Sequence, residues 1–134
     1  MVSLPNSLGR RSGAVVALAA SAMLAGAVPA HAEGSRTSYI SAWTMDHESN
    51  RWHDSHTDDA PTKVAFSGCS SDALDFHAPL NLYRVVSLAP DANYGTSVNY
   101  CNTSNWGDKV NPGDFYFAYK GGYTISVNTV KISW

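Results

Sequence analysis

The sequence predicts an all-β fold, a small antiparallel β-sandwich or barrel of about six strands with one disulfide, after an N-terminal signal peptide. Apolar and polar residues alternate with a period of two after residue 32, and no convincing stretch has the 3.6-residue period of a helix. Clusters of Gly, Pro, Asn and Asp divide the alternating stretches. The two cysteines are the third observation, because an even number in an exported chain is typical of a disulfide.

Residues 1–32 have the organisation of a secretory signal peptide. Arg10 and Arg11 form a basic start, residues 14–28 are an apolar run, and residues 30–32 read Ala-His-Ala, a site that signal peptidase accepts. The run is shorter than the about 20 apolar residues that span a bilayer, so we expect cleavage rather than an uncleaved anchor. The paired arginines leave open whether export follows the general secretory or the twin-arginine route.

Residues 33–134 are predicted to form one secreted domain of about 100 residues, near the common domain size. They hold seven of the nine basic residues and all eleven acidic residues, which gives a net charge of −4. The basic residues are scattered, which argues against a nucleic-acid partner because phosphate binding needs clustered Lys and Arg. We expect a monomer with no stable membrane span.

Cys69 and Cys101 are predicted to form a structural disulfide, since export places them in an oxidising compartment. The loop that they close would stabilise the fold by about 3–4 kcal/mol in the chain-entropy model. Two free thiols or a redox centre are the alternatives. The chain has no Cys-x-x-Cys motif, which argues against a thioredoxin-like redox role.

Six stretches are predicted as strands from their alternation and their turn-rich flanks. Tyr, Ile and Trp mark the first of them, Gly-Cys ends the second, and Pro-Asp-Ala-Asn follows the third. A further short strand at 51–52 would interrupt a polar loop. The predicted strands span residues 38–45, 62–66, 81–88, 97–101, 114–120 and 123–134.

The last two predicted strands carry two specific features. Gly121-Gly122 lies between them and predicts a hairpin turn. In the final strand the apolar residues change from odd to even positions between Val127 and Val130. A regular strand cannot keep both sets on one face, so we predict a β-bulge or tight bend at Asn128-Thr129.

The segment 46–59 is the densest polar cluster, and within it His53, His56, Asp58 and Asp59 are candidate metal ligands. Imidazole nitrogen and carboxylate oxygen can bind Zn²⁺, and carboxylates suit Ca²⁺. The spacing fits no established metal-binding template. Weak Ca²⁺ or Zn²⁺ binding therefore stands beside a simpler interpretation, a solvated loop in which Asp side chains cap turns.

Trp52, Trp106 and Asp108 are candidate ligand-binding residues. A Trp on a loop can stack on a sugar ring or anchor a protein contact, and polar groups surround Trp106 in residues 103–108. The alternative is that these rings cap the open ends of a small core.

No catalytic residue and no cofactor is assigned from the sequence. Gly-x-Ser-x-Gly is absent, and both cysteines are expected to be bonded to each other. The many serines and the histidines permit nucleophilic catalysis but do not indicate it.

Five motifs carry a resemblance to known proteins: residues 49–54, residues 62–69, Cys101, residues 106–108 and residues 113–117. Together they resemble small secreted β-sandwich proteins of actinobacterial and other Gram-positive genomes, a group of unassigned function. More remotely, the exported β-rich chain is similar to lactococcin-type bacteriocins, which are two-sheet sandwiches that act at the cell envelope. That similarity implies antibacterial activity, and neither resemblance assigns a catalytic residue.

Three functions follow as hypotheses. The first is a secreted, non-enzymatic β-sandwich that binds an extracellular protein or a cell-envelope glycan, as export, loop aromatics and the lack of a catalytic motif suggest. The second is a bacteriocin-like antibacterial protein. The third is a metal-dependent hydrolase that uses His53 and His56.

Overall fold

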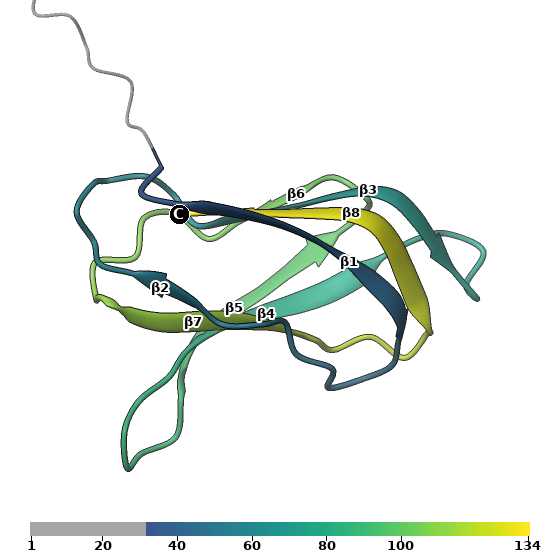
Figure 1. Ribbon diagram of the computed structural model, residues 1–134. Helices are drawn as coiled ribbons and strands as arrows, with labels where there is room; N and C mark the ends of the chain where they lie inside the picture. Colours follow the sequence, from purple (N-terminus) through teal and green to yellow (C-terminus); the bar gives the residue numbers. More distant parts are fainter. Residues whose placement is uncertain (1–31) are drawn as a thin grey trace, which may run out of the picture.

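A computed structural model describes residues 32–134, so the predicted signal peptide lies outside the described residues except for Ala32. The described part is all-β, with no helix, and forms two four-stranded antiparallel sheets packed face to face (Figure 1), which confirms the predicted fold class. The strands are β1 (Ser35–Trp43), β2 (Trp52–Asp54), β3 (Lys63–Ser71), β4 (Ala78–Arg84), β5 (Ala92–Asn99), β6 (Thr103–Asn105), β7 (Gly113–Tyr119) and β8 (Ile125–Ser133).

The chain passes repeatedly between the two sheets. The first sheet has the order β1-β8-β3-β6 and the second has the order β2-β7-β4-β5. Among the described strands, β4 and β5 are the one consecutive pair that lies in the same sheet, and every other connection crosses the sandwich. Gly34 and Trp134 exchange two backbone hydrogen bonds, of 2.9 and 3.0 Å, so the start of β1 and the end of β8 lie together.

Strands β2 and β6 raise the count to eight, where about six were expected. Each has three residues. β2 overlaps the further short strand that the sequence indicated at 51–52, whereas β6 lies in a stretch predicted to be a loop. Strand β3 also continues past Gly68, which was predicted to end it, as far as Ser71. Gly68 accommodates this with a φ of 66°, a left-handed conformation that glycine adopts without a steric cost.

The core lies between the sheets and is built from the inward residues of both. Strand β7 contributes Phe115, Phe117 and Tyr119, each no more than 1% exposed. Full burial of an aliphatic or aromatic side chain stabilises a fold by about 1.5–3 kcal/mol, so each of these residues contributes substantially to the stability. The rest of the buried core is made of Ile40, Trp52, Val64, Phe66, Ala78, Leu80, Leu82, Ile125, Val127, Val130 and Ile132.

The predicted hairpin at Gly121-Gly122 is wrong, because β7 and β8 belong to different sheets. The connection instead crosses from one layer to the other. The Tyr119 hydroxyl folds over it and donates a hydrogen bond of 2.6 Å to the carbonyl of Tyr123. A Cβ on Gly121 would meet the Tyr119 ring at 2.5 Å, so glycine is required here for close packing rather than for a tight turn.

The predicted irregularity at Asn128-Thr129 is confirmed. Val130 pairs with Ser38 and Val127 pairs with Ile40, so β8 has one more residue than β1 across this interval. Both Asn128 and Thr129 are exposed, while Val127 and Val130 are each 1% exposed. The extra residue thus keeps both apolar sets of β8 in the core.

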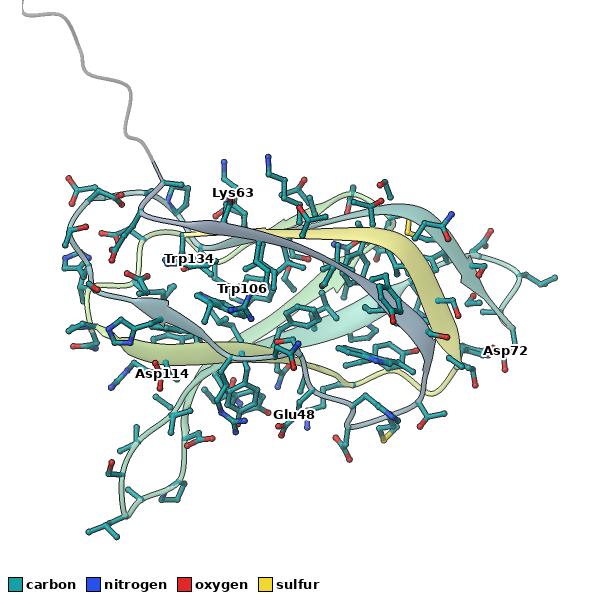
Figure 2. All side chains as sticks on the ribbon, in the orientation of Figure 1. Glu48, Lys63, Asp72, Trp106, Asp114 and Trp134 are labelled. Carbon is teal, nitrogen blue, oxygen red and sulfur yellow. A yellow bond between two sulfur atoms is a disulfide. The ribbon has the colours of Figure 1, made fainter. Side chains whose placement is uncertain are left out.

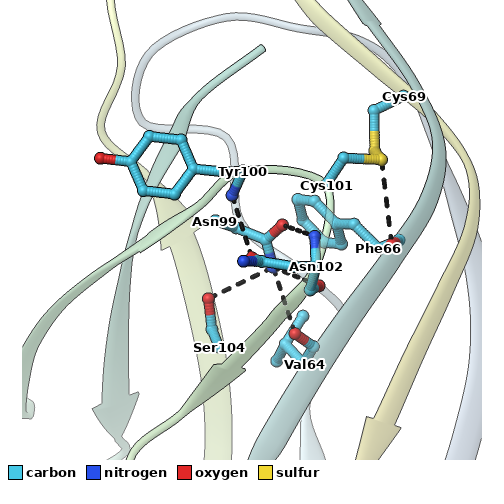
Figure 3. Close-up of a disulfide and its surroundings, with 8 residues drawn as sticks. All are labelled: Val64, Phe66, Cys69, Asn99, Tyr100, Cys101, Asn102 and Ser104. Carbon is cyan, nitrogen blue, oxygen red and sulfur yellow. Dashed lines mark hydrogen bonds between the residues drawn. A yellow bond between two sulfur atoms is a disulfide. The ribbon is translucent and has the colours of Figure 1, made fainter.

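Cys69 and Cys101 form the predicted disulfide, which joins β3 to the connection between β5 and β6 (Figure 3). Next to it, the fully buried Asn99 fixes the same connection. Its side-chain amide donates to the carbonyls of Val64 and Asn102 at 3.2 and 3.0 Å, and its carbonyl oxygen accepts from the Asn102 N–H at 3.0 Å. A covalent bond and a buried polar network therefore hold one turn.

Residues 32–134 contain no helix of the length and apolar character needed to cross a membrane.

Candidate functional site

An open cleft of about 260 Å³ lies between the two sheets, at the edge formed by β1 and by the segment that precedes β2. We call it the edge cleft. Its floor is apolar and consists of Ile40, Trp43, Phe117 and Ile132. Its rim is polar and consists of Arg36, Ser38, Tyr39, Glu48, Ser49 and Asn50. Because Ile40, Phe117 and Ile132 are each at most 3% exposed, the cleft offers mainly polar groups to a ligand.

Three local features expose this cleft. β1 and β2 are the edge strands of their sheets in the described structure, so no further strand closes the sandwich here. The register of β1 against β8 shifts between Ile40 and Trp43, and Ala42 has a φ of 49°. This shift directs Trp43 inward, with its ring centroid 5.8 Å from that of Phe117.

The rim of the edge cleft offers hydrogen-bonding groups of both kinds. Arg36 uses one guanidinium nitrogen to donate to the Arg51 carbonyl at 2.8 Å, which holds the side chain in place. Ser49 is fully engaged, since its hydroxyl donates to the Asn50 carbonyl and accepts from the Phe117 N–H. Within the described part of the chain, the side chains of Ser38, Tyr39 and Asn50 make no hydrogen bonds and so remain free for a ligand. The Tyr39 side chain is the most prominent, since that residue is 72% exposed.

A second hollow, of about 460 Å³, adjoins the edge cleft and shares Glu48 with it. In the view of Figure 2, Glu48 projects from the lower layer of the sandwich. The floor of this hollow contains two stacked tyrosines, Tyr83 and Tyr116, with ring centroids 5.3 Å apart. Arg51 lies 4.7 Å above the Tyr116 ring and Lys120 lies 5.7 Å from the Tyr83 ring, so cations cover both ends of the stack.

Ion pairs and hydrogen bonds inside this second hollow satisfy its own charges. The Tyr116 hydroxyl donates to Asp91 at 2.5 Å, and this hydrogen bond lowers the pKa of the Asp91 carboxyl. Burial, and then the hydrogen bond to Asp91, raise the pKa of Tyr116. Lys120 lies 2.7 Å from Asp46, whose hydrogen bond raises the pKa of the lysine. Because these groups are already paired, the second hollow is less suited to a ligand than the edge cleft.

The predicted metal-ligating residues are only partly brought together. His56 and Asp59 lie in one group with Asp108, which the sequence had indicated as a ligand-binding residue instead. His53 points elsewhere and contacts Asp114, with 2.8 Å between its Nδ1 and the carboxylate. Asp58 accepts a hydrogen bond of 2.8 Å from the Ala60 N–H, as the turn-capping alternative predicts.

Glu33 fixes the loop that carries His56. Its two carboxylate oxygens accept hydrogen bonds from the backbone of Thr57, at 3.1 Å, and of Ser55, at 2.9 Å. These bonds, chiefly the one from Thr57, lower the pKa of Glu33 to about 2. The neighbouring Asp54 is 5% exposed, and burial raises its pKa.

The predicted ligand-binding tryptophans do not present free rings. Trp52 is 2% exposed and packs between Phe115 and Trp134, so it is a core residue and not a surface platform. Trp106 is half-buried against the core, and its indole nitrogen donates to the Gly95 carbonyl at 3.1 Å. Both tryptophans therefore agree with the alternative interpretation, in which these rings cap the ends of the core and do not bind a ligand.

Sequence reasoning did not select the residues of the edge cleft. Tyr39 lies in the predicted first strand and Arg36 lies before its predicted start, and nothing in the strand pattern shows that β1 is an edge strand. Trp43 gave a weak signal, as an aromatic residue near a predicted loop. The missing information is the pairing between distant strands, which leaves the β1 edge unpaired.

The chain matches no protein-family model, no curated protein and no solved structure. The resemblances to secreted actinobacterial proteins and to bacteriocins therefore stay predictions.

Proposed function

We propose that this protein is an exported, non-enzymatic binding domain that recognises a neutral glycan of the cell envelope through the edge cleft. The observation that carries the proposal is the composition of that cleft, a rim of unengaged hydrogen-bonding side chains above a small apolar floor that includes Trp43. Export is supported by the signal-like N-terminus and by the disulfide, which persists in oxidising compartments.

Aromatic residues give the edge cleft affinity for a sugar ring. One face of a pyranose presents C–H groups, which pack on the flat ring of a Trp or Tyr, while the hydroxyl groups need polar partners. Tyr39 supplies an exposed ring, and Ser38 and Asn50 supply both donors and acceptors, whereas the Trp43 ring packs against His47 and Phe117. A protein partner would be expected to cover a larger and flatter surface than a cleft of this size.

The charges favour a neutral ligand. The rim holds one cation, Arg36, and one anion, Glu48, so the cleft itself is balanced. The exported domain is expected to carry a net charge of −4, from seven basic and eleven acidic residues after Ala32. An anionic wall polymer would meet this negative field, whereas an N-acetylated amino sugar would not.

The proposal is tested by titrating the purified protein with a tetrasaccharide of N-acetylglucosamine, followed by calorimetry and by tryptophan fluorescence. We expect a Kd below about 1 mM, which corresponds to about −4 kcal/mol. Tyr39→Ala should raise the Kd by up to about tenfold, because stacking on one ring contributes about 0.5–1.5 kcal/mol.

The matched control is Tyr100→Ala. Tyr100 is similarly exposed, at 64%, but does not line the cleft, so its removal should leave the Kd unchanged. Equal losses in the two variants would contradict the site, and no binding at 10 mM sugar would contradict the ligand class. Binding of an extracellular protein in place of the sugar would likewise overturn the glycan assignment.

A further inference from the structure

The residue that follows the predicted cleavage site is built into the fold. Cleavage after Ala32 would make Glu33 the first residue of the exported chain. The next residue, Gly34, exchanges backbone hydrogen bonds of 2.9 and 3.0 Å with Trp134, so the start of β1 is fixed beside the C-terminus (Figure 1). A Cβ on Gly34 would meet the Trp134 ring at 2.5 Å, so the chain packs directly against that ring. The predicted new terminus therefore has a defined place in the structure.

The Glu33 side chain meets a second carboxylate at the turn that follows β2. The N–H groups of Ser55 and Thr57 donate to the two oxygens of Glu33, at 2.9 and 3.1 Å. Between them, the N–H of His56 donates to Asp54 at 2.8 Å. These three donors belong to successive residues, whose Cα atoms are about 3.8 Å apart, so the carboxylates that accept from them lie close together.

Neither carboxylate has an ion-pair partner among residues 32–134. Glu33 is ionised, because the hydrogen bond from Thr57 and its neighbours lower its pKa to about 2. Asp54 is 5% exposed, and burial raises its pKa; the hydrogen bond from His56 opposes this rise, and the charge of Glu33 adds to it. Little water reaches Asp54 to screen the repulsion between the two carboxylates. A positive charge beside them would stabilise the folded domain.

We propose that cleavage after Ala32 supplies this charge, and that the α-ammonium group of Glu33 forms an ion pair with Asp54. With one water molecule, hydrolysis of the peptide bond between Ala32 and Glu33 gives a carboxylate on Ala32 and an ammonium group on Glu33. Before hydrolysis that nitrogen is a neutral amide. Afterwards it is mostly charged at pH 7, since the pKa of an α-amino group is about 7.7–8.0.

Processing would thus increase the stability of the domain, and the precursor would be less stable than the exported form. The new charge arises on the residue whose side chain already lies beside Asp54, so no rearrangement of the fold is needed. The inference rests on export, which is one part of the proposed function, and is independent of the glycan.

The ion pair is tested by comparing two forms of the chain that begins at Glu33. One form has a free α-amino group, and the other carries an acetyl group on that nitrogen, which removes the charge. We expect the free form to have a Tm about 5 °C higher at pH 6.5. In Asp54→Asn the difference should fall below about 1 °C, because the amide is neutral but still accepts the hydrogen bond from His56.

Asp59→Asn is the matched control. It removes an exposed carboxylate in the same β2–β3 connection, so the difference of about 5 °C should remain. Equal Tm values for the free and acetylated wild type, or a difference that survives Asp54→Asn, would overturn the ion pair. Mass spectrometry of the exported protein should find Glu33 at its N-terminus, and another first residue would overturn the role of cleavage. Failure of glycan binding would leave the Tm difference unchanged, so the two proposals fail separately.

Discussion

Breaking the bond between Cys69 and Cys101 is expected to destabilise the folded domain by about 3.7 kcal/mol. The two cysteines are 32 residues apart in the sequence. For a loop of this length, the chain-entropy model predicts that breaking the cross-link raises the conformational entropy of the unfolded chain by about 12 cal/mol/K. At 25 °C this corresponds to about 3.7 kcal/mol of lost stability. With an unfolding entropy of about 2.1 cal/mol/K per residue and about 100 residues, the Tm should fall by about 17 °C.

The native structure itself should survive the loss of the bond. Cys69 remains within β3, where its neighbours pair with β8, and the Asn99 network still holds the connection that carries Cys101. The effect should therefore arise in the unfolded state, and the reduced protein should keep its β-sheet circular dichroism at room temperature.

Two samples measure this effect by urea unfolding. One is the wild type in a phosphine reductant, which loses only the bond, and the other is Cys69→Ala/Cys101→Ala, which also loses both sulfur atoms. Reduction alone should account for most of the loss in both samples. A loss below 1 kcal/mol in the reduced protein would refute the entropic reasoning and would show that the turn is already constrained in the unfolded chain.

Three other substitutions test separate parts of the fold. Asn99→Ala should destabilise the protein by about 3 kcal/mol in urea unfolding, because it removes the amide that donates to the buried Val64 carbonyl and the buried Ser104 hydroxyl. Gly68→Ala should cost about 2 kcal/mol in the same assay, because φ is positive and the new Cβ would lie 2.6 Å from the Asn128 side chain, and a neutral result would contradict that packing. Tyr116→Phe should reduce the loss of stability on acidification. Its hydroxyl lowers the pKa of Asp91, so the wild type gains stability above the unfolded carboxyl pKa of about 3.9 and loses it as the pH falls through the lower folded value. Unfolding at pH 6 and pH 3 measures this difference, and equal losses in both proteins would contradict the assignment.

The candidate sites depend on tertiary structure to different degrees. His56 and Asp59 were selected from the sequence because they lie in one polar segment. Asp108 belongs to a second loop and lies beside them only in the folded structure. His53 lies outside the group because it pairs with Asp114 of the neighbouring strand. The edge cleft could not be predicted from the sequence, because the order of the strands in each sheet decides which strand edges stay unpaired.

The sequence by itself determined the local features of the chain, namely the alternating strands, the disulfide and the bend at Asn128-Thr129. The strands and the bend follow from short-range patterns, because the side chains of a strand alternate between two faces whatever its partners are. The disulfide follows from the presence of only two cysteines in a chain predicted to be exported. Only the tertiary structure decided which sheet each strand joins, that Gly121-Gly122 crosses between layers, and that Trp52 is buried. Those outcomes depend on contacts between residues far apart in the chain, and short-range alternation carries no information about such contacts.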